Sequence, residues 1–195
     1  DIHPSMSLAL GPCEASVGEM VSAYTAFVNN GIRISPLFVT RIEDNQGNVI
    51  ARFQPRMNEV INAESANKML VLLQAVVNEG TAGRLRYKFG LKNEIGGKTG
   101  TTNRNSDAWF IGFTPQLVSG CWVGGDDRDI HFDSTSMGQG ATMALPIWAY
   151  FMKKVYADKA LGYDINATFD LPANFDPCYN SEQGYDEFGI DEVYE

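Results

Sequence analysis

The chain has 195 residues, of which 44% are hydrophobic and 11% aromatic, and its formal net charge at pH 7 is -9. These values are typical of one globular domain, and no apolar run is long enough to cross a bilayer. Nine acidic residues and no Lys or Arg lie from Ala160 onward, so the other 15 acidic residues balance the 15 basic ones. The acidity therefore belongs to the tail, and the absence of a basic patch disfavours nucleic-acid binding.

The beginning of the chain suggests that it is part of something longer. It starts with Asp1, shows no signal peptide and enters a patterned segment at residues 7–10. We therefore expect a piece cut from a longer protein. Within it we expect residues 1–157 to form part of a domain. Residues 158–195 have scattered Pro, Asn and Gly with weak periodicity, which predicts an acidic tail that is extended or disordered.

Three cysteines, Cys13, Cys121 and Cys178, match no metal-ligand spacing, and only His3 and His131 could assist them. We therefore predict no metal site. A disulfide between Cys13 and Cys178 stays open for an oxidising compartment, but three separate thiols are the favoured interpretation.

Three segments carry apolar residues at steps of three and four, which predicts amphipathic helices. Asn62 is a plausible N-cap and Gly80 a plausible C-cap of the second helix, which should pack on a sheet. Pro146 falls near the first turns of the third helix, where proline is tolerated. The three predicted helices are residues 14–30, 62–80 and 141–156.

Several short apolar runs bounded by turn residues predict strands. Residues 37–43 and 49–53 should form a hairpin. A basic loop with Arg84, Arg86 and Lys88 should lead into a meander, and Trp122 and Trp148 should lie in the core. The three strands of the meander are residues 95–102, 107–114 and 117–124. We predict an α/β fold of the α+β type, an antiparallel sheet flanked by helices.

The strand at residues 95–102 is the best candidate for a site. Gly96, Gly97 and Gly100 weaken a strand unless something approaches its backbone closely, and a ligand lying along it would explain them. Strand alternation puts Thr99 and Thr101 on one face and Lys98 on the other with Gly100. Hydroxyls, edge N–H groups and a lysine together favour an anionic ligand such as a carboxylate over a merely solvated lysine.

A phosphate-binding P-loop also contains Gly-Lys-Thr. That motif needs a glycine where this chain has Lys92, and a helix must follow it. The segment after Lys98 instead predicts a turn and a strand. We therefore reject a nucleotide site.

A longer pattern surrounds Lys98. Residues 97–102 read Gly-Lys-Thr-Gly-Thr-Thr, residues 107–115 read Asp-Ala-Trp-Phe-Ile-Gly-Phe-Thr-Pro, and residues 121–124 read Cys-Trp-Val-Gly. These blocks resemble the penicillin-binding transpeptidases, most closely the bifunctional class A penicillin-binding proteins, in which Lys-Thr-Gly is one of three sequence elements. The likeness spans residues 8 to about 152. Its further blocks are residues 9–11, 19–24, 80–83 and 144–148.

The chain departs from this family in one important respect. The family's nucleophile is the serine of a Ser-x-x-Lys element, followed by a separate Ser-x-Asn element, both upstream of Lys-Thr-Gly. Residues 65–68, Ser-Ala-Asn-Lys, fit both patterns at once, which one serine cannot serve. We interpret Ser65 as a decoy and expect no nucleophile in this chain. The resemblance therefore implies only part of a penicillin-binding transpeptidase or serine β-lactamase-like fold.

The resemblance implies acyl transfer in peptidoglycan synthesis. A serine attacks a carbonyl of a D-Ala-D-Ala stem peptide, and D-alanine leaves. An amine of a neighbouring stem peptide then resolves the acyl-enzyme. A β-lactam mimics the substrate, and the reaction stalls after acylation. Lys98 would shape the field and proton transfer around the nucleophile. Thr99, Gly100 and Thr101 would bind the substrate, and the Thr101 backbone N–H would be one oxyanion donor. No cofactor is called for.

The resemblance also implies the setting. The parent would carry an upstream glycosyltransferase domain and a membrane anchor, and would act at the periplasmic or extracytoplasmic face of the cytoplasmic membrane. Its partners would be stem peptides and β-lactams. We expect the isolated piece to be inactive, to make no membrane contact itself, and to associate through surfaces that the rest of the domain would cover.

Two alternatives remain. The chain could be a non-catalytic module of the same fold that binds stem peptides or a partner, with the acidic tail as a docking segment. A serine β-lactamase is disfavoured, because it would lack a strand like that at residues 107–109.

Overall fold

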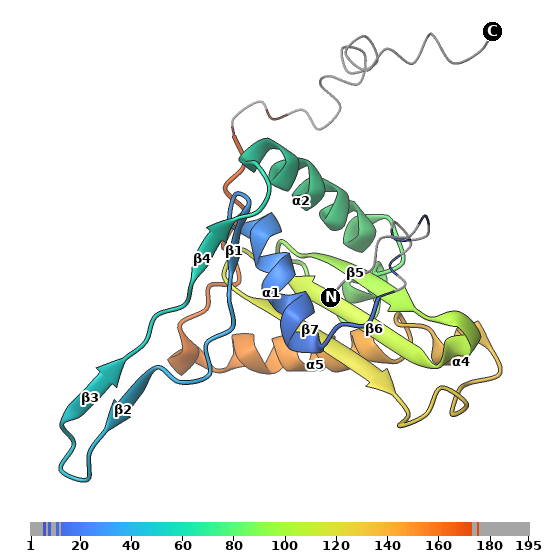
Figure 1. Cartoon of the computed structure of the whole chain (residues 1–195). Helices are drawn as coiled ribbons and strands as arrows, with labels where there is room; N and C mark the ends of the chain where they lie inside the picture. Colours follow the sequence, from blue (N-terminus) through green and yellow to red (C-terminus); the bar gives the residue numbers. More distant parts are fainter. Residues whose placement is uncertain (1–5, 7, 9–10, 12, 173–174, 176–195) are drawn as a thin grey trace, which may run out of the picture.

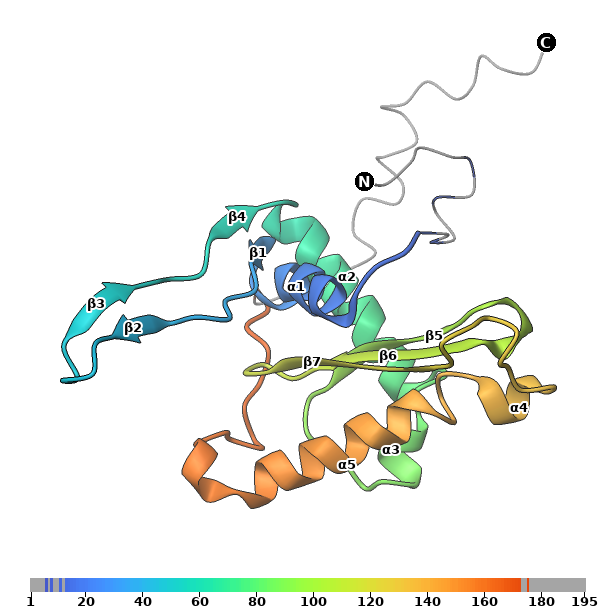
Figure 2. The same cartoon turned by 60° about the horizontal axis from the view of Figure 1, so that its bottom comes forward.

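A three-stranded antiparallel sheet separates two layers of helices in the computed structural model, which describes residues 6, 8, 11, 13–172 and 175. Helices α1 and α2 lie on one face of this sheet and α5 lies on the other (Figures 1 and 2). This mixed architecture confirms the predicted fold class. In chain order the elements are α1 (Val17–Val28), β1 (Ile32–Ile34), β2 (Arg41–Glu43), β3 (Val49–Arg52), β4 (Met57–Glu59), α2 (Ala63–Asn78), α3 (Arg84–Tyr87), β5 (Gly96–Thr101), η2 (Asn103–Asn105), β6 (Asp107–Phe113), β7 (Val118–Gly124), α4 (Thr135–Gly138), α5 (Ala144–Ala157) and η3 (Lys159–Leu161).

The sheet is the predicted meander, in the order β5-β6-β7. Gly96 pairs with Phe113 at one end of the β5–β6 ladder, and Thr101 pairs with Ala108 at the other. The central strand β6 is almost entirely buried, because helices cover both of its faces. Strand β5 lies at the edge of the sheet.

The core between the sheet and α5 is built around Trp148, whose side chain is only 2% exposed. Its ring meets that of Phe110 edge-on at a centroid distance of 5.3 Å. Gly112 leaves room for this pair, since a Cβ at that position would lie 2.6 Å from the Trp148 ring. Leu85 from α3 and Phe89 complete this layer.

The second core lies between the sheet and the helices α1 and α2. Leu70 and Leu73 of α2 pack there against Phe113, with Tyr24 of α1 beside them. Phe169, which follows α5, also packs onto Phe113, with ring centroids 5.8 Å apart. The chain beyond residue 157 therefore contacts the body, and the boundary at 157 remains a prediction. Most of the predicted disordered tail, residues 173, 174 and 176–195, lies outside the described residues.

The helix ends follow local polar contacts. Ser16 and Glu19 form a capping box at the start of α1. Asn62 caps α2 as predicted, because its side-chain oxygen accepts the Ser65 N–H at 2.8 Å. The C-cap of α2 is Glu79, one residue before the expected Gly80. Gly31 has φ +89 after α1, and a Cβ there would lie 1.9 Å from the Ile61 carbonyl oxygen, so glycine is required.

Two predictions about local structure are wrong. The predicted basic loop contains the short helix α3, which forms because Leu85 is buried and Arg86 donates to the carbonyl groups of Leu91 and Asn93. Trp122 is 42% exposed instead of lying in the core. Its ring carries an N–H group, which it directs to a carboxylate at the surface.

The predicted hairpin forms an arm that projects from the body (Figure 1). Its strands β2 and β3 are almost fully exposed. At its base, β1 and β4 form a further antiparallel pair that was not predicted. None of the helices in the described part of the chain is long and apolar enough to span a membrane.

The packing of Trp148 predicts a large loss of stability when its ring is removed. Trp148→Ala should lower the free energy of unfolding by about 3–5 kcal/mol, because it leaves a cavity under β6. Ile147→Ala is the matched control on the same helix, since Ile147 is 52% exposed, and should change stability by less than about 0.5 kcal/mol. Urea unfolding followed by circular dichroism measures both. Similar losses for the two variants would contradict this assignment of the core.

Candidate functional site

The free edge of β5 presents backbone groups outward. The Thr102 N–H donates to the Asp107 carbonyl oxygen at 3.1 Å, so Thr102 faces β6. Backbone groups alternate in an antiparallel ladder. The N–H and C=O groups of Thr99 and Thr101 therefore point away from β6, toward the outer edge of the sheet.

The side chains of β5 divide between two faces as the alternation predicts. Thr99 and Thr101 stand opposite Phe110 and Ala108, whose side chains belong to the core under α5. The Thr99 hydroxyl lies 2.8 Å from the Thr81 hydroxyl. The Thr101 hydroxyl accepts a hydrogen bond from the Gly140 N–H at 3.1 Å. Both hydroxyls are thus held by residues from other segments.

Lys98 stands opposite Ile111, on the face that carries α1 and α2. Its side chain is exposed. The Lys98 Nζ nevertheless donates to the Thr99 carbonyl oxygen at 2.8 Å, on the outer edge. The ammonium group therefore joins the edge N–H groups from one face while the hydroxyls approach from the other.

The glycines of β5 have a packing role that sequence reasoning did not anticipate. A Cβ on Gly96 would lie 2.4 Å from the Phe113 ring, and one on Gly97 would lie 2.8 Å from the Ile111 carbonyl oxygen. A Cβ on Gly100 would lie 3.0 Å from that of Trp109. Side chains and backbone of β6 therefore fill this space, and the glycines require no ligand to explain them.

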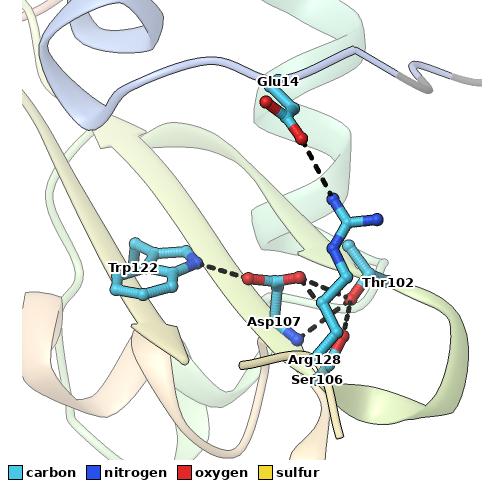
Figure 3. A network of polar contacts seen from close by, with 6 residues as sticks. All are labelled: Glu14, Thr102, Ser106, Asp107, Trp122 and Arg128. Carbon is cyan, nitrogen blue, oxygen red and sulfur yellow. Dashed lines mark hydrogen bonds and ion pairs between the residues drawn. The ribbon is translucent and has the colours of Figure 1, made fainter. Parts of the chain in front are cut away.

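A network of polar contacts closes the end of β5 (Figure 3). The Asp107 carboxylate accepts hydrogen bonds from the Trp122 indole at 2.9 Å, the Thr102 hydroxyl at 3.0 Å and the Ser106 hydroxyl at 3.3 Å. The Asp107 N–H in turn donates to the Thr102 hydroxyl at 2.9 Å. Arg128 Nη2 lies 3.8 Å from Glu14 Oε1, and the charge of Arg128 acts on the Asp107 carboxylate. This network ties the turn between β5 and β6 to β7.

The network also lowers the pKa of Asp107. Partial burial by itself would raise it, but the hydrogen bonds from Trp122, Thr102 and Ser106, with the charge of Arg128, outweigh burial. The carboxylate is therefore ionised and acts as an acceptor of hydrogen bonds.

The structure does not bring Ser65 to β5. Ser65 is exposed in the first turn of α2. The opposite end of α2 leads to Thr81, which contacts Thr99. The helix from Ser65 to Asn78 extends about 20 Å at 1.5 Å per residue. Lys68, the lysine of the same motif, is paired with Glu64 at 2.8 Å.

Sequence reasoning missed two groups at the site, Thr81 and Gly140. Thr81 was noted only as part of a block similar to one in the family. The thiols offer no further candidate: Cys13 is exposed, and burial raises the pKa of the half-buried Cys121. Cys178 lies outside the described residues, so the pairing with Cys13 that the sequence left open, like the favoured interpretation of three separate thiols, remains a prediction.

The fold agrees with the comparisons. The sequence model of the penicillin-binding protein transpeptidase domain matches residues 3–120. The chain therefore belongs to the penicillin-binding protein transpeptidase domain family, as the motifs predicted.

Relatives and solved structures are consistent with this family. Penicillin-binding protein 1A of Aquifex aeolicus (strain VF5) is 39% identical over 158 residues, which are 80% of this chain and 20% of that protein. Its counterpart in Neisseria lactamica is 37% identical, over 78% of this chain and 19% of that protein. The chain thus spans about a fifth of the length of these curated relatives.

Two solved structures share the fold over most of the chain. Penicillin-binding protein 1A from Haemophilus influenzae has a TM-score of 0.74 at 28% identity, covering 86% of this chain and 29% of that chain. The PonA1 protein from Mycobacterium tuberculosis, in complex with penicillin V, has a TM-score of 0.69 at 27% identity, covering 87% of this chain and 44% of that chain.

The lowered pKa of Asp107 predicts a pH-dependent contribution to stability. A depressed carboxyl pKa stabilises the fold above the unfolded-state value of about 3.9, and the contribution is lost as pH falls through the folded-state pKa. Wild type should therefore be more stable than Asp107→Asn at pH 7, and the gap should close below about pH 4. Trp122→Phe removes one hydrogen-bond donor to the carboxylate. In this background, Asp107→Asn should therefore lower the free energy of unfolding at pH 7 by less than it does in the wild-type protein.

Circular-dichroism unfolding between about pH 3 and pH 7 measures these differences. A gap that is constant or grows on acidification would show that the network does not favour the ionised carboxylate.

Proposed function

We propose that the chain is the C-terminal part of a peptidoglycan transpeptidase domain whose β5 edge forms the substrate-binding wall. The observation that carries this proposal is the convergence of the Lys98 ammonium with the hydroxyls and backbone N–H groups of Thr99 and Thr101 on one free strand edge. Positive charge and hydrogen-bond donors together suit a carboxylate and a developing oxyanion.

Each group has a role in the proposed acyl transfer. Thr99 and Thr101 donate hydrogen bonds from their hydroxyls to the substrate carboxylate, and Gly100, which carries no side chain, lies between them in the substrate-binding strand. The Thr101 N–H is one oxyanion donor, a role supported by its direction away from β6. Lys98 stabilises charge and assists proton transfer at the nucleophile. The ammonium group of Lys98 reaches the outer edge of the strand, where the nucleophile would lie.

The serine nucleophile and the second oxyanion donor come from a part of the domain outside this chain. This proposal is supported by the position of Ser65 at the far end of α2 and by the pairing of Lys68 with Glu64. It is also supported by the relatives, of which the chain covers only a fifth.

The proposed parent cross-links D-Ala-D-Ala stem peptides and is acylated by β-lactams. The complex of a structural neighbour with penicillin V supports β-lactam binding. We further propose an upstream glycosyltransferase domain and a membrane anchor in the parent, with the domain at the extracytoplasmic face of the cytoplasmic membrane. The isolated chain should be inactive.

The role of Lys98 can be tested in the full-length protein that contains this chain. Lys98→Ala should slow acylation by a fluorescent penicillin about 10²- to 10⁴-fold, because charge stabilisation and proton transfer at the nucleophile are lost. Lys92→Ala is the matched control, since Lys92 is also exposed but precedes the strand, and it should react within about twofold of wild type. Acylation of Lys98→Ala at the wild-type rate would refute the proposed role.

A further inference from the structure

The two hydroxyls of β5 are each contacted by a polar group from another segment. Thr101 Oγ1 accepts the Gly140 N–H at 3.1 Å, and Thr99 Oγ1 lies 2.8 Å from Thr81 Oγ1. Neither Thr81 nor Gly140 belongs to the strand. Their contacts decide in which direction the β5 hydroxyls can donate.

Gly140 determines the polarity of the Thr101 hydroxyl. A backbone N–H can only donate, so the Thr101 oxygen is the acceptor, and its own proton must point elsewhere. Gly140 is fixed against β5, because a Cβ on it would lie 2.5 Å from the Gly100 carbonyl oxygen and 2.3 Å from that of Trp109. The Thr101 O–H group is therefore left to donate a hydrogen bond to a ligand.

The contact between Thr81 and Thr99 works in two directions, since either hydroxyl can be the donor. When the Thr99 hydroxyl donates to Thr81, it cannot donate to a ligand. When the Thr81 hydroxyl donates to Thr99, the Thr99 O–H is left to donate a hydrogen bond outward, and both β5 hydroxyls can then donate to a ligand together. An approaching acceptor favours the second arrangement, because hydroxyl protons rotate freely.

A pair of outward donors suits an ionised carboxylate better than a neutral group. A carboxylate only accepts hydrogen bonds, and bonds to it are about twice as strong as those between neutral groups. The acceptor strength of an ester or amide is lower. Orientation of both hydroxyls as donors would therefore select for charge at this position.

Thr81 itself is held in place by its neighbours. The adjacent Ala82 is fully buried, and its N–H donates to the Val76 carbonyl oxygen at 3.0 Å. The Gly83 N–H donates to the Gly80 carbonyl oxygen at 3.1 Å. The end of α2 thus presents the Thr81 hydroxyl to Thr99 from an anchored turn.

We propose that Thr81 is a positioning residue that orients the Thr99 hydroxyl as a donor to the substrate carboxylate, as Gly140 does for Thr101. This inference rests on the proposed transpeptidase function, because it assigns the carboxylate of that substrate to these hydroxyls. Thr81 would act through Thr99 without touching the reacting atoms.

The test uses the full-length protein and two probes, benzylpenicillin and its methyl ester, which lacks the carboxylate charge. Thr81→Val should lower the second-order acylation rate with benzylpenicillin about 5- to 20-fold and leave that with the ester nearly unchanged. Thr81→Ser keeps the hydroxyl and should restore the acid-to-ester ratio to within about twofold of wild type. The ratio is independent of the fraction of folded protein, and Thr81→Ala provides a second variant if Thr81→Val does not fold.

The outcomes separate this inference from the function on which it rests. An equal loss with both probes would reveal a merely structural role for Thr81 and overturn the inference alone. An unchanged rate with benzylpenicillin would also overturn it alone. A wild-type protein that neither probe acylates would overturn the proposed function, and the inference with it.

Discussion

The pairing of β5 with β6 in one register is the constraint on which the candidate site depends. Side chains and backbone groups of a strand alternate with a period of two, so a slip by one residue would exchange the faces of Lys98 and Thr99. Contacts at the end of the ladder oppose such a slip: the Thr102 N–H donates to the Asp107 carbonyl, and the Asp107 N–H donates to the Thr102 hydroxyl. The ionised side chain of Asp107 binds that turn to β7 through Trp122.

The rest of the fold makes the edge of β5 rigid while leaving it accessible. Gly112 admits the Trp148 ring on one face of the sheet, and Phe113 receives aromatic side chains on the other. Both faces are therefore occupied by packing, whereas no strand in the described part of the chain pairs with the outer edge of β5. Such an edge offers N–H and C=O groups to an extended peptide, which is a common mode of peptide recognition. In the proposed domain, the chain contributes one wall of the site and another segment contributes the nucleophile.

Sequence patterns predicted the long elements because each buries an apolar stripe against a neighbour, and that stripe is visible as periodicity. They failed where a contact between distant residues decides the structure. The segment with Leu85 and Arg86 appeared to be a polar loop, yet burial and carbonyl contacts make it helical. Trp122 appeared to be core because its polar N–H was not considered. The contact between Thr81 and Thr99, two segments of the chain brought together by α2 and β5, has no signature in local sequence.

The central claim is that this chain holds the substrate-binding strand but not the nucleophile. The most direct measurement is the mass-spectrometric mapping of the covalent penicillin adduct, in the full-length protein and in the 195-residue chain. The account predicts an adduct on a serine outside this chain in the full-length protein, and no adduct on the isolated chain. An adduct on any serine of the chain, and on Ser65 above all, would contradict it.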